Sequence, residues 1–140
     1  MENRVLLVED EAPLRRSLEK FLERAGYAFD SCATAREALV LAEKLDYNIA
    51  LVEYHLPDAN GASLLEKLRR TIPDIATIMI SEYDFQAVVC DLVRTNVRCY
   101  LKKPFDLAEF EAALKNRVSV EKSDWAQEFS VEGMPASVLK

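Results

Sequence analysis

The residues best able to do chemistry in this 140-residue chain are acids, a serine and a lysine that border short hydrophobic runs. In order along the chain they are Glu9, Asp10, Glu53, Ser81 and Lys103. Three clustered carboxylates repel one another, and Mg²⁺, which prefers oxygen ligands, relieves that repulsion. A serine hydroxyl donates to an anionic oxygen, and an ammonium neutralises the charge on it. If these side chains meet, they suit a divalent cation with an anion beside it.

The chain alternates between strand-like and helix-like patterns, and the elements so predicted must bring these residues together. Short apolar runs predict strands at about 4–8, 27–32, 48–52, 75–80 and 98–101. Helical spacing and end signals predict helices at about 13–25, 34–44, 61–72, 84–94 and 106–118. Five strands alternating with five helices imply a parallel sheet covered on both faces, with right-handed crossovers.

The last predicted helix carries the clearest start signal. Asp106 is a candidate N-cap with Glu109 three residues later, which is a capping-box spacing. Phe105 and Phe110 stand at the spacing of a hydrophobic staple. We therefore expect this helix to begin directly after Asp106.

In an open parallel sheet, ligands bind beyond the carboxyl ends of the strands. The acids at positions 9, 10 and 53, Ser81 and Lys103 all follow predicted strands, and these strands are four different ones. A single acid at a strand end is more often a solvated loop residue. Joint placement at four strand ends favours one common site instead.

Composition limits the classes of function. The net charge of -6 and the pI of about 4.9 give no reason to expect a nucleic-acid surface. The three cysteines, Cys32, Cys90 and Cys99, lack metal-site or CxxC spacing, and we expect reduced thiols packed like small apolar residues. No apolar run approaches the roughly 20 residues of a membrane span, and MENRVLLVED is not a signal peptide, so a cytoplasmic protein is expected.

The periodic pattern ends near residue 119. We expect one domain over 1–119 and a C-terminal linker or extension over 120–140 without its own fold. The latter contains Trp125 and Phe129, and it is open whether it is a linker, a helical extension or a docked segment.

Four segments together resemble the receiver domain of two-component response regulators, namely LLVEDEAP, EYHLPDANG, IMISEYD and YLKKPF. The resemblance covers about residues 3–119 and is highly specific in its spacing. It implies a flavodoxin-like fold with strand order 2-1-3-4-5. It also implies that a histidine kinase or phosphotransfer protein passes a phosphoryl group to an aspartate in the presence of Mg²⁺.

The resemblance implies a role for each acid of the cluster. By position, Glu9 and Asp10 match the metal-binding acids, and Glu53 matches the phosphoacceptor, which also binds the metal. The backbone carbonyl of His55 would complete the metal shell, while the His55 side chain is expected to be exposed. Asp58, further along the same loop, is rejected as a substitute acceptor.

The resemblance implies a switch as well. Ser81 matches the switch hydroxyl, which also binds phosphate, and Tyr100 matches the switch aromatic. Lys103 matches the phosphate-binding lysine, with a cis bond to Pro104. The expected partner surface is formed by the fourth helix, fifth strand and fifth helix, which meet a downstream protein or a second copy of the chain.

The sequence departs from the family at the acceptor, where glutamate replaces aspartate. The additional methylene displaces the carboxylate, and phosphoryl transfer depends on in-line positioning. We therefore predict that phosphorylation is lost or badly impaired. Glu82, after the switch serine, either adds bulk and negative charge beside the site or extends into solvent. Glu53 is also an incomplete phosphoaspartate mimic, and whether it activates the domain stays open.

The sequence thus favours an atypical receiver that acts through protein–protein interaction and is not an enzyme, with Mg²⁺ bound weakly or not at all. The alternative is a conventional Mg²⁺-dependent receiver that regulates a transcription output domain absent from this chain. A flavin carrier on the same fold is disfavoured, because EDEAP after the first strand would repel a phosphate. Direct contact of this domain with nucleic acid or with a membrane is not expected.

Overall fold

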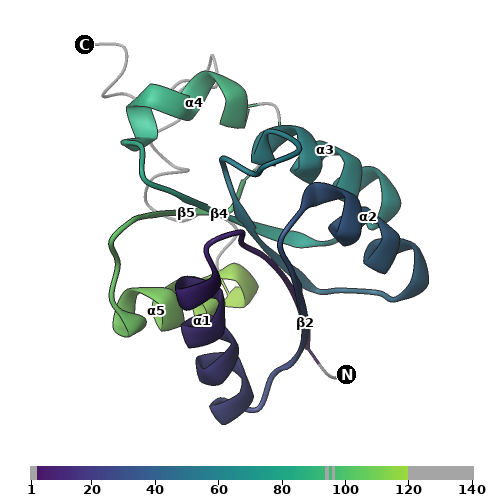
Figure 1. Ribbon diagram of the computed structural model, residues 1–140, viewed down its shortest axis with the longest axis vertical. Coiled ribbons are helices and arrows are strands. Elements are labelled where there is room, and N and C mark those ends of the chain that lie inside the picture. Colours follow the sequence, from purple (N-terminus) through teal and green to yellow (C-terminus); the bar gives the residue numbers. More distant parts are fainter. Residues whose placement is uncertain (1–2, 94, 96, 120–140) are drawn as a thin grey trace.

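The computed structural model describes residues 3–93, 95 and 97–119. Five strands form one sheet: β1 (Arg4–Val8), β2 (Ala28–Cys32), β3 (Ile49–Glu53), β4 (Ala76–Ser81) and β5 (Cys99–Lys102). They alternate with α1 (Ala12–Arg24), α2 (Ala35–Lys44), α3 (Gly61–Thr71), α4 (Phe85–Val93) and α5 (Leu107–Ser119). All neighbouring strands pair in parallel, in the order β2-β1-β3-β4-β5 (Figure 1). The predicted parallel sheet and its implied strand order are confirmed.

The sheet is buried between two layers of helices. Side chains alternate across β1, so that Leu6 and Val8 pack with α2, α3 and α4, whereas Val5 and Leu7 pack with α1 and α5. Figure 1 shows α1 and α5 on one side of the sheet and α2 and α3 on the other. Because both faces are covered, the carboxyl ends of the strands form a rigid platform for polar side chains.

Local sequence signals fix the start of α5 as predicted. Asp106 Oδ1 accepts a hydrogen bond from Glu109 N–H at 2.8 Å, and Glu109 Oε1 accepts from Asp106 N–H at 3.0 Å. The rings of Phe105 and Phe110 stack with centroids 6.1 Å apart. Both the capping box and the hydrophobic staple are confirmed.

Three strands extend one residue further than their hydrophobic runs predict. Glu53 closes β3, Ser81 closes β4 and Lys102 closes β5. In the ladder Glu53 is opposite Ile80, and Ser81 is opposite Lys102. Backbone pairing continues after the apolar run has ended. These polar residues therefore belong to the last paired positions of the strands and not to the loops.

The three cysteines do not all pack as expected. Cys32 is buried and Cys99 is half-buried, whereas Cys90 is exposed on α4, which corrects the expectation for that thiol. Across the residues that the structure describes, none of the helices combines the length and apolar character that a membrane crossing requires.

Candidate functional site

Glu53 is a buried carboxylate with a defined place. It is 3% exposed at the end of β3. Its Oε2 accepts a hydrogen bond from His55 N–H at 2.8 Å. Its Oε1 lies 2.6 Å from Lys103 Nζ in an ion pair, with no hydrogen bond of its own. The side chain therefore bridges the backbone of the following loop and the lysine that directly follows β5.

Lys103 is the cation of the site. Its Nζ lies 3.3 Å from Glu9 Oε2 and 3.1 Å from Glu11 Oε1, in addition to the contact with Glu53. Burial opposes the charged ammonium, but the Glu53 contact and the charge of Glu9 outweigh it and hold the pKa of Lys103 above its ordinary value. The Lys103–Pro104 peptide bond is cis, as the resemblance implies.

Glu9 is the most enclosed acid of the site. It is fully buried, and its Oε2 accepts a hydrogen bond from Glu11 N–H at 3.0 Å. Its Oε1 is buried and has no hydrogen-bond partner. Burial raises the pKa of Glu9 to about 7, against the lowering effects of the Glu11 hydrogen bond and Lys103. An unpaired buried oxygen of this kind is costly unless something binds it.

Three acids can offer oxygens to one cation. Glu9, Asp10 and Glu53 each contribute an oxygen within 4.8 Å of the others, and Asp10 is the exposed member. Together with the unpaired Glu9 Oε1, this donor set fits an oxygen-preferring divalent ion. The His55 side chain is exposed, as expected, and the proposed ligation by its backbone carbonyl stays a prediction.

Ser81 and Tyr100 meet at the loop that follows β4. Ser81 is fully buried, and its Oγ accepts a hydrogen bond from Tyr83 N–H at 3.0 Å. The hydroxyl of half-buried Tyr100 donates to the Tyr83 carbonyl, and its ring lies edge-on to Phe85 at 5.4 Å. Burial raises the pKa of Tyr100, opposed by a hydrogen bond with Ser81. The two predicted switch residues are thus joined through Tyr83.

Gly61 allows the first residue of α3 to approach the backbone of Glu53. A Cβ atom at Gly61 would lie 2.3 Å from the Glu53 carbonyl oxygen and 2.8 Å from Tyr54 Cα. The neighbouring Asn60 side chain caps α3 by accepting from Ala62 N–H at 2.7 Å. Only glycine fits where α3 touches the end of β3.

Two acids have roles that the sequence interpretation missed. Glu11 reaches Lys103 although its side chain is 60% exposed, and the third acid of the EDE run was the only signal for it. Asp58 accepts from Ala35 and Arg36 N–H at 2.9 and 3.0 Å, and these bonds lower its pKa. Asp58 thus caps α2, more than 20 residues earlier in the chain, which no local pattern signals.

The charges beside the site point outward. Glu82 is exposed, so its carboxylate adds negative potential at the rim without filling the site. Lys102, in contrast to Lys103, is exposed and pairs with Asp84 at 2.7 Å. Of the two lysines, only Lys103 contacts the buried acids Glu9 and Glu53.

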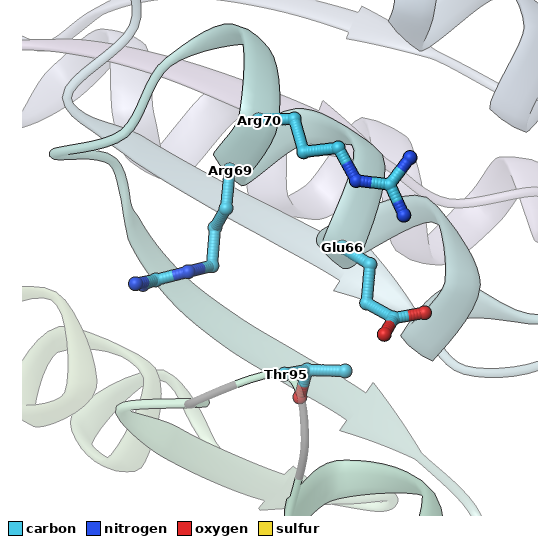
Figure 2. Close-up of a pocket in the computed structure, with 4 residues that line it drawn as sticks. All are labelled: Glu66, Arg69, Arg70 and Thr95. Atoms are coloured by element: carbon cyan, nitrogen blue, oxygen red, sulfur yellow. The ribbon is translucent and has the colours of Figure 1, made fainter.

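A separate hollow of about 260 Å³ lies at the last turn of α3, lined by Glu66, Arg69, Arg70 and Thr95. Figure 2 shows the side chains of Arg69 and Arg70 pointing apart. They do not converge on one anion there, so the acidic site at the other end of α3 is the better candidate.

Comparisons with known proteins agree with this geometry. Residues 5–115 match the model of the family described as "Response regulator receiver domain". The chain is 34% identical to the sensor kinase CckA of Brucella abortus over 86% of the chain but only 13% of the kinase. It is 30% identical to the chemotaxis protein CheY of Thermotoga maritima, over 85% of the chain and 99% of that protein.

One solved structure is similar to the chain in both fold and sequence. It is a response regulator from Burkholderia pseudomallei "with a phosphorylated aspartic acid, calcium ion and citrate". The TM-score is 0.75 and the identity 29%, over 86% of this chain and 71% of that one.

Proposed function

Because the chain belongs to the response regulator receiver domain family, we propose that it is an atypical receiver in phosphorelay signalling. It signals by binding other proteins, and phosphorylation at Glu53 is lost or strongly impaired. The domain proposed spans residues 1–119, and the linker or extension predicted for 120–140 lies outside the residues that the structure describes. The proposed setting is the cytoplasm.

The position of the Glu53 carboxylate is the observation that carries this proposal. Its two oxygens are already held by Lys103 Nζ and His55 N–H, at 2.6 and 2.8 Å. An incoming phosphoryl group needs a free nucleophilic oxygen in line with its leaving group and positive charge around its equatorial oxygens. The Glu53 carboxylate pairs with Lys103, which would otherwise neutralise the oxygens of the incoming phosphoryl group. Both requirements are therefore met poorly.

The acids retain the donor set for a cation even so. Glu9, Asp10 and Glu53 would hold Mg²⁺, with the His55 carbonyl as a further ligand. The ion would supply neutralisation of phosphoryl oxygens during transfer. Because Lys103 already neutralises two of these carboxylates, the ion competes with an ammonium and binds weakly.

Partners follow from the same proposal. A histidine kinase or phosphotransfer protein would approach the acidic edge, and a downstream protein or a second copy would bind α4, β5 and α5. Signalling by binding requires no catalytic group, so the domain is proposed not to be an enzyme.

Phosphoryl uptake tests the proposal. The full chain and its Glu53→Asp variant are incubated separately with labelled acetyl phosphate, with and without Mg²⁺. We expect Mg²⁺-dependent label in Glu53→Asp and at least tenfold less in the parent. Glu53→Gln provides the background. Equal labelling of parent and Glu53→Asp would refute the proposal.

The second candidate is a conventional Mg²⁺-dependent receiver that regulates a transcription output domain outside this chain. The unpaired buried oxygen of Glu9 favours it, because a bound ion would satisfy that atom. The calcium ion in the Burkholderia structure is consistent with cation binding in the family. Mg²⁺-dependent labelling of the parent would select this candidate.

A further inference from the structure

We infer that Tyr54 and Asp91 form a second link from the acidic site to α4, in addition to the link through Ser81 and Tyr100. This inference rests on the proposed function, in which α4, β5 and α5 bind a downstream protein or a second copy of the chain. Tyr54 is then a positioning residue for the switch.

Tyr54 is attached to both ends of this link. It directly follows Glu53, and its backbone N–H donates to Ile80 C=O at 2.7 Å while its carbonyl accepts from Gly61 N–H at 2.6 Å. Its side chain is half-buried, and its hydroxyl donates to the Asp91 carboxylate on α4. Burial and the Asp91 hydrogen bond raise the pKa of Tyr54, so the hydroxyl keeps its proton. One residue therefore joins the end of β3 directly to a helix.

The position of Tyr54 depends on Glu53. Glu53 Oε2 accepts from the N–H of His55, so the carboxylate constrains the backbone on the far side of Tyr54. The close fit of Gly61 against the Glu53 carbonyl and Tyr54 Cα leaves this backbone little room. We therefore expect a change in charge or length at position 53 to shift Tyr54, because close-packed segments transmit small displacements.

The two links meet at one loop residue. The Tyr54 ring lies edge-on to the Tyr83 ring, with centroids 5.8 Å apart. The N–H of Tyr83 donates to Ser81 Oγ, and its carbonyl accepts from the Tyr100 hydroxyl. Tyr83 thus contacts both links, and this residue is 48% exposed at the start of the α4 surface.

Amide hydrogen exchange of α4, measured on the full chain, tests the inference. Glu53→Gln removes the charge at position 53 with little change in shape and is expected to change exchange in residues 85–93 about fivefold, the effect of one net hydrogen bond. In Tyr54→Phe, which keeps the ring but lacks the hydroxyl, the same Glu53→Gln change should have at most half that effect. In Asp91→Ala, the effect of Glu53→Gln on α4 exchange should be reduced as much as in Tyr54→Phe.

Tyr47→Phe is the matched control. The Tyr47 hydroxyl donates to Asp30 at 2.8 Å, so this variant also loses a tyrosine–aspartate hydrogen bond, but one remote from α4. The full response to Glu53→Gln should persist there. A merely structural role for Tyr54 would raise α4 exchange without altering the response to Glu53→Gln.

The outcomes separate the inference from its basis. Suppose that Glu53→Gln changes α4 exchange in the parent and changes it equally in the Tyr54→Phe and Asp91→Ala backgrounds. The second link then does not exist, although the proposed function stands. If α4 in the parent does not respond at all, the link is excluded together with transmission from position 53.

Discussion

At the level of single residues, one ammonium group, that of Lys103, forms ion pairs with several carboxylates of the site. Lys103 contacts Glu9, Glu11 and Glu53, and the first and last of these are buried. Breaking a buried ion pair by removing one partner leaves an uncompensated charge. The neighbouring Lys102 makes only a surface pair with Asp84.

Substitution of the two lysines should therefore have unequal effects. Lys103→Met is expected to lower the free energy of unfolding by about 3 kcal/mol at pH 8, since two buried carboxylates lose their counter-charge. Lys102→Met should cost less than about 1 kcal/mol. Urea unfolding of both variants measures the difference, and equal losses would show that Lys103 does not stabilise the buried acids.

Most of the site residues could be predicted, because strand ends of one parallel sheet meet at one edge. Glu9, Asp10, Glu53 and Lys103 do lie together. Their functional roles remain predictions. The contact of Glu11 with Lys103 could not be predicted, because it depends on how far a flexible, exposed side chain turns back.

At the scale of elements, the end of β3 and the start of α3 must touch for Glu53 to be held. Gly61 provides that contact, and a Cβ there would meet backbone atoms, which cannot move aside as a flexible side chain can. Gly26, which follows the C-terminal end of α1, has a φ of 87° and open space around it.

Alanine at these two glycines separates crowding from backbone strain. Gly61→Ala is expected to cost about 1–3 kcal/mol and to perturb the amide resonances of residues 53–55, because β3 and α3 must separate. Gly26→Ala should cost about 1 kcal/mol from its left-handed conformation and leave those resonances unchanged. Chemical denaturation and amide NMR provide the two readouts. Unchanged resonances in Gly61→Ala would contradict the packing argument.

Helix starts were predictable where both partners of a cap are close in sequence. Asp106 and Glu109 are three residues apart and behave as predicted. Asp58 caps α2 from a loop beyond β3, and such a partner is set by the tertiary fold. The strands β3, β4 and β5 end one residue later than predicted, because hydrophobicity ends before the backbone ladder does.

At the scale of the whole molecule, stability and site chemistry oppose each other. The fold buries Glu9 and Glu53 with one lysine and leaves Glu9 Oε1 without a hydrogen bond. Alternation of elements predicted a parallel sheet, but the strand order came from the family resemblance, since periodicity does not specify which strands are neighbours. The confirmed order is what brings β1, β3 and β5 to one site.

This conflict predicts a pH dependence of global stability. Burial raises the pKa of Glu9 from 4.5 to about 7 in the folded protein, so its stabilising contribution is complete below pH 4.5. That contribution is lost as the pH rises through about 7, by roughly 3 kcal/mol. Glu9→Gln should therefore gain stability relative to the parent between pH 5 and pH 8, measured by urea unfolding in EDTA.

Glu23→Gln, an exposed change on α1, is the control and should show no such gain. A constant difference between Glu9→Gln and the parent across this pH range would mean that Glu9 is ionised throughout.

The longer side chain at position 53 is proposed to prevent phosphoryl acceptance. The most direct test of this proposal is a competition in one tube. Equal amounts of the parent and Glu53→Asp, which differ in mass by one methylene, are incubated with acetyl phosphate and Mg²⁺ and resolved by intact-protein mass spectrometry. We predict a phosphorylated species from Glu53→Asp alone, whereas phosphorylation of both proteins to the same extent would contradict the account.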